Sequence, residues 1–391
     1  MSKSSRINGF DAMRTIAMWL GVVLHAIIAY KLTPEPGWPH DPAADSALLD
    51  WTYDIIHAFR MPLFFMVAGF FTRMVLLKSG ARYFVRQRYR RIVLPFVIGV
   101  VLIVPLTLLP FHFNKYFYQR GLSLEEARRA AGAELLHWNG LAHLWFLYYL
   151  IIFYAMGVGI FLILKKRNLF FDHRHKSHFD EIGPLAILSF AMLLGTVLML
   201  FNAFIPPVYT GIKPNLFYVL YYGLFFFGGW LAQVNPTGVQ SLSRWGWTYL
   251  AGGIGLSFYM MEKSSDGAPV YQFYLSAIQS VFLVAGTTGI FMKYFHRESA
   301  LWRYLSDSAY WVYLVHMGIV AAMQVALHDL QWNPWAKLTL ILVVAFGLSL
   351  LSYHLLVRYT LIGVFLHGKR ENPRKNVGFS EQILGNTCKH K

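Results

Sequence analysis

The sequence predicts an all-α, polytopic integral membrane protein with about ten transmembrane helices. Of its 391 residues, 56% are hydrophobic and 17% aromatic, whereas only 14% are charged. Soluble domains have about 25% charged residues. Apolar runs close to the ~20 residues that cross a bilayer recur along the chain. Most lysines and arginines lie in alternate connecting segments, as expected when positive loops stay in the cytoplasm.

Ten spans of this kind make up one membrane domain, residues 1–366, followed by a polar basic cytoplasmic tail, residues 367–391. The first span contains Arg14 and His25 and no small-residue cleavage site follows it, so it is not a cleavable signal peptide. The single cysteine, Cys388, excludes a disulfide framework. The spans are expected at about 10–31, 51–77, 92–111, 141–164, 183–205, 216–234, 246–262, 271–293, 304–327 and 337–366.

The charge distribution predicts that both termini are cytoplasmic. The net charge of +16 largely reflects the basic cytoplasmic segments. Because these residues are spread over loops between spans, nucleic acid is not an expected partner. The longest outer segment, 112–140, is expected to contain a short amphipathic helix at 124–134.

The first span carries the most informative pair of residues, Arg14 and His25. Eleven residues are about three helical turns, so both side chains lie on one face, roughly 16 Å apart along the axis. Ionisable residues inside a membrane are costly and are usually functional. One helix therefore presents a guanidinium near the cytoplasmic surface and an imidazole deeper in the membrane, which suits substrates that arrive from opposite sides.

The second span carries Asp54, His57 and Arg60 at intervals of three residues, so neighbouring members can touch. The first two spans are joined by a short connection and are expected to be neighbours. Asp54 and His57 could then lie roughly level with His25. The alternative is structural, with Asp54 and Arg60 each paired to a neighbouring span.

The segment after the second span is unusually basic, with six positive charges in residues 78–91. Arg88 and Arg91 could bind phosphates, because arginine binds them bidentately. The equally supported alternative is a topological signal in contact with anionic lipid.

Two later spans add candidate residues. The fourth opens with His143 and Trp145, which could bind substrate or form an ordinary interfacial aromatic belt. The ninth contains Tyr313 and His316, and His316 is too deep for such a belt. It is either catalytic or a buried histidine bonded to a serine or a backbone carbonyl. No metal is expected, since no H-E-x-x-H or comparable histidine pair exists.

These segments together resemble the membrane acyltransferase family 3 over nearly the whole chain. The second-span motif, which begins at Asp54, is similar to the glucan-biosynthesis protein C branch, thought to succinylate periplasmic glucans. Ala68-Gly69 stands where the family usually has Ser-Gly. The matching motifs are Asp11-x-x-Arg14 followed by His25, the block around Leu63–Gly69, Arg91-Ile-Val-Leu-Pro95, His143-Leu-Trp-Phe-Leu and Tyr310-x-x-Tyr313-Leu-Val-His316.

The resemblance implies a bacterial inner-membrane enzyme that takes an acyl group from cytoplasmic acyl-coenzyme A, a substrate and not a bound cofactor. The acceptor would be a hydroxyl of a glucan, another glycan or a lipid. Arg14, Arg88 and Arg91 would hold the nucleotide end of the donor, and Asp11 would position Arg14. His25 would be the general base, oriented by Asp54, and His57, His143 and Trp145 would contact the acceptor. The oxyanion donors would be Arg60, Tyr313 and His316.

The leading expectation is therefore an O-succinyltransferase acting on periplasmic glucans. An O-acetyltransferase of another surface polysaccharide or lipid is the alternative within the family. A proton-coupled transporter or flippase is the alternative from another class, because it too would need intramembrane Asp, His and Arg. No inverted repeat or matched pair of interrupted helices favours the transporter. The oligomeric state is not predicted.

Overall fold

The computed structural model describes residues 8–137, 140–168, 181–260, 269–295 and 299–367, and all regular structure within them is helical. The all-α prediction is confirmed. Among the described residues, six helical stretches are long and apolar enough to cross a membrane, or seven if the pair α8 and α9, bent by 111°, forms one span. The expected ten spans and cytoplasmic termini remain predictions, and residues 368–391 of the predicted tail lie outside the described residues.

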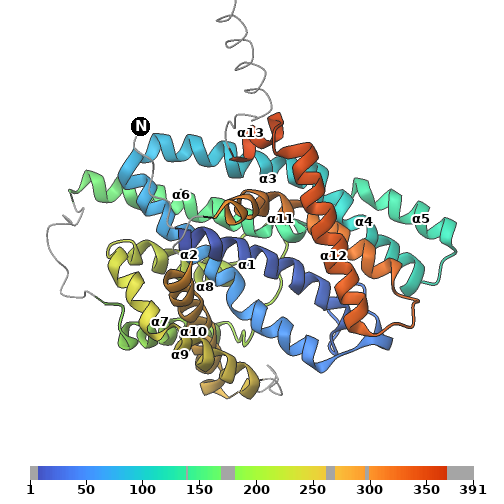
Figure 1. The fold of residues 1–391 in the computed structure, drawn as a ribbon, viewed down its shortest axis with the longest axis horizontal. Helices are drawn as coiled ribbons and strands as arrows, with labels where there is room; N and C mark the ends of the chain where they lie inside the picture. The colour runs from blue at the N-terminus through green and yellow to red at the C-terminus, as the bar shows by residue number, and fades with distance from the viewer. Residues whose placement is uncertain (1–7, 138–139, 169–180, 261–268, 296–298, 368–391) are drawn as a thin grey trace, which may run out of the picture.

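Helix α1, Asn8–Ile27, lies in the middle of the molecule and packs against α2, α10, α11 and α12 (Figure 1). Helices α7 to α10 gather on one side of α1, and α4 and α5 lie on the other (Figure 1). The remaining helices are α2 (Ala47–Arg88), α3 (Leu94–Ile98), α4 (Val104–Asn114), α5 (Leu124–Ala133), α6 (Trp145–Lys166), α7 (Pro184–Leu200), α8 (Leu216–Ala232), α9 (Pro236–Met260), α10 (Val270–Tyr294), α11 (Ala300–Ala326), α12 (Pro334–Ser352) and α13 (Leu361–His367).

Helix α2 extends well beyond its predicted span. The basic segment 78–91, expected as a loop, is helical apart from a break at Gly80, where φ is +78°. Only glycine adopts this conformation at little cost. The residues after Gly80 are mostly good helix formers, so the chain resumes a helix instead of forming an open loop. Short π-helical turns then link α2 to α3 and α4.

The crossing of α2 and α8 depends on two glycines. A Cβ atom added to Gly69 would lie 1.8 Å from the carbonyl oxygen of Phe226, and one added to Gly229 would lie 1.8 Å from that of Met66. Both distances are far below van der Waals contact, so any side chain would separate the helices. Gly69 is the second residue of the Ala68-Gly69 pair, which explains in packing terms why glycine is required there.

The predicted amphipathic helix in the outer segment is confirmed as α5. Ser123 caps its N-terminus by accepting from the backbone N–H of Glu126, and the Glu126 carboxylate accepts from the backbone N–H of Ser123. This reciprocal pair is a capping box. The hydrogen bonds from Ser123 hold the pKa of Glu126 below its usual value.

Candidate active site

Three histidines from three separate elements meet beside α1. The ring centroid of His316, on α11, lies 5.3 Å from that of His25 on α1 and 5.6 Å from that of His143, in the turn before α6. His316 and His143 are buried, at 2% and 6% exposure, whereas His25 is partly exposed. The structure therefore brings together three predicted residues that are far apart in the sequence. The nearest two, His25 and His143, are separated by 118 positions.

Backbone carbonyls fix the proton positions on two of these rings. His316 Nδ1 lies 3.0 Å from the carbonyl oxygen of Val312 and 2.9 Å from that of Tyr313, and His143 Nε2 lies 3.1 Å from that of Leu314. A carbonyl only accepts, so each of these nitrogens carries a proton. The other nitrogens, His316 Nε2 and His143 Nδ1, are buried with no partner in the part of the chain that the structure describes. In a neutral imidazole this second nitrogen has a lone pair and no proton. Neutral His316 can therefore accept a proton there, and it cannot act as the expected oxyanion donor.

Arg60 on α2 supplies the positive charge of the site. A Cβ added to Gly21 of α1 would lie 2.0 Å from Arg60 Nη1, so the guanidinium fills the space that this glycine leaves open, one turn before His25. Arg60 forms no ion pair with any acid that the structure describes, and its Nε is buried without a partner. Its charge acts on His25, His57 and His316. The role of Arg60 as an oxyanion donor stays a prediction.

Tyr313 plays a different part from the one expected. Its hydroxyl donates to the carbonyl oxygen of His143 at 2.7 Å, so its only proton is already used. The turn that carries His143 is strained, because Ala142 has φ of +45°, a region that non-glycine residues seldom occupy. Strain of this kind persists only where surrounding contacts hold it. Tyr313 is one such contact, and it fixes His143 beside His316.

Two residues of this site were not predicted from the sequence. The indole of Trp38 stacks on the His25 imidazole, with centroids 5.3 Å apart and planes 8° apart. Gln324 on α11 accepts from the Trp38 indole N–H at 3.0 Å and donates to the carbonyl oxygen of His25 at 2.9 Å. A tryptophan between Gly37 and Pro39 in a short connection was the available signal.

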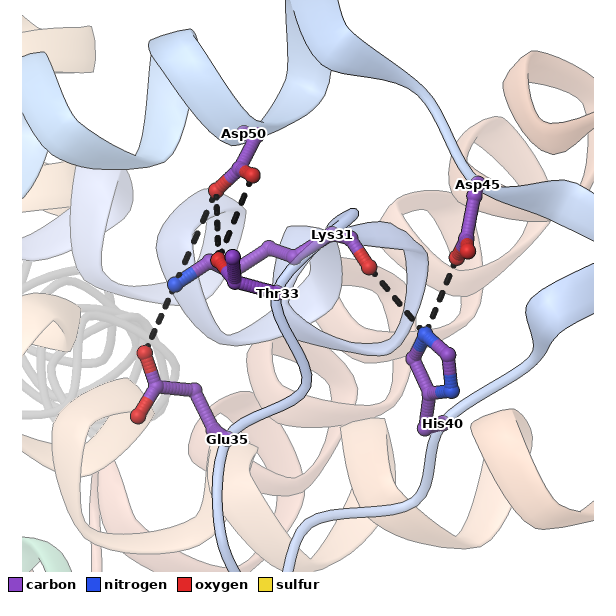
Figure 2. Close-up of polar contacts among 6 residues, drawn as sticks. All are labelled: Lys31, Thr33, Glu35, His40, Asp45 and Asp50. Atoms are coloured by element: carbon purple, nitrogen blue, oxygen red, sulfur yellow. Dashed lines mark hydrogen bonds and ion pairs between the residues drawn. The ribbon is translucent and has the colours of Figure 1, made fainter. Parts of the chain in front are cut away.

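Trp38 belongs to the segment 31–46 between α1 and α2, which we call the strap. Lys31 forms ion pairs with Glu35 at 2.6 Å and with Asp50 of α2 at 3.7 Å (Figure 2). His40 Nε2 donates to the carbonyl oxygen of Lys31 at 3.1 Å and to Asp45 at 2.9 Å (Figure 2). One group of bonds fixes the part of the strap before Trp38, and the other fixes the part after it.

A buried ion pair attaches the strap to a further helix. Asp41 of the strap pairs with Lys337 of α12, and both side chains are almost fully buried. A buried charge is stable only when it is paired, so this contact fixes where the strap lies. Lys337, expected at the outer edge of a span, is therefore internal.

Asp54 does not join the histidines. It lines a separate small cavity of about 30 Å³, which is bounded by α9 and α10 and by residues 204–206. The residue has no hydrogen bond to His25, whose Nδ1 is buried without a partner. The structure thus gives no support to Asp54 as the acid that orients His25. His57, one turn further along α2, is held by the carbonyl oxygen of Pro206 at 3.1 Å.

Trp145 lies in an aromatic cluster between α6 and α8. Its ring centroid is 5.2 Å from that of Tyr218 and 5.5 Å from that of Tyr222. These edge and tilted contacts are typical of packing. Trp145 is thus engaged with α8, and the structure provides no contact between it and the histidines.

The predicted donor-binding arginines lie apart from the histidine cluster. Arg14 is on α1 with His25, as expected, and pairs with Asp11 at 3.6 Å, which confirms the predicted partner. Arg88, near the end of α2, stacks over the rings of Phe84 and Tyr154 at 5.0 and 4.9 Å. Arg91 follows it in the π-helical turn.

The arrangement is suited to moving a proton and stabilising an anion. His25 and the two buried lone pairs of His143 and His316 can accept protons, and Arg60 can donate to a developing negative charge. No group of three His, Cys, Asp or Glu side chains within the described ranges is placed to hold a metal ion. The histidines and Arg60 can support acid–base and electrostatic chemistry.

Comparison with known proteins agrees with this chemistry. The sequence profile of the acyltransferase domain of acyltransferase family 3 matches residues 7–354, most of the chain. The chain belongs to this family. The family match makes the protein an acyltransferase, and its apolar helices fit a membrane enzyme.

Two relatives within the acyltransferases are similar to this chain over nearly its full length. Glucans biosynthesis protein C of Salmonella typhi is 24% identical over 377 residues, which cover 92% of this chain and 94% of that protein. Glucans biosynthesis protein C of Escherichia coli K12 is 24% identical over 381 residues, covering 94% and 95%. No solved structure matches the chain.

Proposed function

We propose that the protein transfers a succinyl group from cytoplasmic acyl-coenzyme A to sugar hydroxyls of a periplasmic glucan. It would do so as a multi-pass protein of the bacterial inner membrane, with about ten spans and both termini in the cytoplasm. The observation that carries the proposal is the meeting of His25, His143 and His316 with Arg60 at one end of α1, whose other end carries Arg14. The glucan acceptor is suggested by the name of the relatives.

Helix α1 connects the two substrates in this proposal. Arg14, Arg88 and Arg91 bind the phosphates of the donor at the cytoplasmic surface, where arginine pairs bidentately with phosphate. The pantetheine arm extends beside α1 for the roughly 16 Å between Arg14 and His25. The thioester carbon then lies next to the histidines, and the sugar hydroxyl enters from the opposite side.

The transfer proceeds by general base catalysis. His25 takes the proton of the sugar hydroxyl as the oxygen attacks the thioester carbon. The charge that forms on the carbonyl oxygen is met by Arg60. When this intermediate collapses, the C–S bond breaks, and the coenzyme A thiolate leaves with the proton that the His25 imidazolium returns. The products are the sugar ester and free coenzyme A, and no other reactant is needed.

The unpaired charge of Arg60 favours an anionic acyl group. Arg60 is only partly exposed and has no counter-ion among the described residues, and a substrate carboxylate can supply one. The guanidinium has five N–H donors, enough for both an oxyanion and the distal carboxylate of a succinyl group. An acetyl group would leave that second interaction unmade. A succinyl group is therefore favoured over an acetyl group.

The test uses purified protein with radiolabelled succinyl- or acetyl-coenzyme A and periplasmic glucan. Label should pass to the glucan, and succinyl-coenzyme A should have the larger kcat/KM. Preference for acetyl-coenzyme A would support the O-acetyltransferase alternative. Absence of both transfer and thioester hydrolysis, with transport in proteoliposomes, would support a carrier.

A further inference from the structure

The orientation of the His25 imidazole needs an explanation, because no hydrogen bond from a described residue holds it. The rings of His143 and His316 are each fixed by backbone carbonyls, whereas His25 Nδ1 is buried without a partner. A general base must be oriented, since a displacement of about 1 Å costs about 100-fold in rate. Two ring contacts remain, a tilted one with His316 and a stack on Trp38. The stack, with planes only 8° apart, is the one that can fix the plane of the imidazole.

Gln324 joins both members of this stack. Its Nε2 donates to the carbonyl oxygens of His25 and Ala26, at 2.9 and 3.2 Å. These carbonyls belong to the last turn of α1, where the helix supplies no further N–H partner. Its Oε1 accepts from the Trp38 indole N–H at 3.0 Å. Only one orientation of the amide allows both bonds, because the indole only donates and the carbonyls only accept.

The contacts form a closed ring: His25 ring to Trp38, Trp38 to Gln324, and Gln324 to the His25 backbone. Trp38 also contacts Phe111, whose ring centroid lies 4.8 Å away at an interplanar angle of 85°. Gln324 lies on the same helix as His316, eight residues further on. The cycle of contacts therefore also fixes the position of His25 relative to His316.

We propose that Trp38 and Gln324 are positioning residues that hold the His25 imidazole in its reactive orientation. The proposal rests on the proposed role of His25 as general base. Trp38 fixes the plane of the ring, and its indole face favours the imidazolium that forms during transfer. Gln324 fixes Trp38 and the end of α1 together. The strap, with its ion pairs at Lys31 and Asp41, holds Trp38 in reach.

The experiment compares the full-length variants Trp38→Leu, Trp38→Phe and Gln324→Met by acyl transfer, with kcat and KM measured separately. Trp38→Leu should lower kcat about 10- to 100-fold with little change in the KM of the donor. Trp38→Phe keeps an aromatic face and loses only the hydrogen bond to Gln324, so it should lower kcat less than Trp38→Leu does. Gln324→Met loses that bond and also those to the carbonyl oxygens of His25 and Ala26, so it should lower kcat more than Trp38→Phe. Trp332→Leu, at an exposed site in a later connection, is the matched control and should be unchanged.

A second readout does not depend on activity. Exchange of the imidazole C2 hydrogen of His25, followed by mass spectrometry, should change in Trp38→Leu and Gln324→Met and stay constant in Trp332→Leu. If Trp38→Leu does not fold, Gln324→Met carries the test through both readouts.

Wild-type kcat and unchanged His25 exchange in the folded variants would overturn the proposal. A purely structural role would instead lower thermal stability and leave kcat per folded molecule unchanged. His25→Ala separates this failure from a failure of the proposed function. If His25→Ala is inactive while Trp38→Leu is fully active, only the positioning role is wrong. If His25→Ala is itself active, the general-base assignment is wrong.

Discussion

Replacing Gly21 with alanine is expected to separate activity from stability. The added Cβ would lie 2.0 Å from Arg60 Nη1, whereas nonbonded atoms need about 3.5 Å. The guanidinium must therefore move by roughly 1.5 Å. Because this atom is the end of a flexible side chain, the fold can accommodate the shift, but the charge leaves its position beside His25.

The two effects of Gly21→Ala have opposite signs. Alanine in a helix is favoured over glycine by about 0.5–1 kcal/mol, so thermal stability should stay the same or rise. A catalytic group displaced by more than about 1 Å costs about 100-fold in rate, so kcat should fall by about two orders of magnitude. A simple folding defect could not produce this combination.

The assay is transfer of radiolabelled acyl groups, with thermal unfolding measured on the same preparation. Gly255→Ala is the matched control, because it lies on helix α9 and an added Cβ there meets no atom within 4 Å. It should gain the same stability and keep full activity. A Gly21→Ala protein with wild-type kcat would refute the role given to Arg60.

Three further predictions concern residues outside the histidine cluster. Arg88→Gln should weaken coenzyme A binding, with a loss that shrinks at high salt, and equal dissociation constants by calorimetry would leave Arg88 only its stacking role. Asp54→Asn should keep kcat per folded molecule close to the wild-type value, because Asp54 lines a separate cavity; a 100-fold fall would restore it as the partner of His25. Lys337→Met should destabilise the protein by about 3–5 kcal/mol by leaving Asp41 buried and unpaired. Denaturant unfolding in detergent measures this, and a loss below about 1 kcal/mol would contradict it.

The sequence predicts features that depend on one helix. Arg14 and His25 lie on α1, Asp11 pairs with Arg14, and the short amphipathic helix forms as α5, all as expected. Each follows from helical spacing or from local hydrogen bonding, which a single sequence contains.

The spacing of residues along one helix does not predict features that depend on how different helices pack together. Periodicity places Asp54 on a face of α2 but does not say which helix covers that face, and it is covered by α9 and α10 instead of α1. The convergence of His25 with His316 likewise depends on the packing of α1 against α11. The helical course of residues 81–88 was missed because a charged segment between apolar runs is typical of a loop.

Trp38 and Gln324 were missed for a related reason. A tryptophan in a short connection and a glutamine in an apolar helix are each common, and only their contact with His25 distinguishes them. Tyr313 was predicted as part of the site, but its role depends on the direction of one O–H group, which the sequence does not contain.

Turnover by His25→Ala, measured per folded molecule with succinyl-coenzyme A and glucan, tests the central claim most directly. The loss of a general base lowers a rate by about 10²–10⁴-fold. We expect a loss of that size, with coenzyme A affinity and thermal stability close to the wild-type values, because Arg14, Arg88 and Arg91 are untouched. Near-wild-type turnover in the folded variant would contradict the assignment of His25 as the base that activates the acceptor.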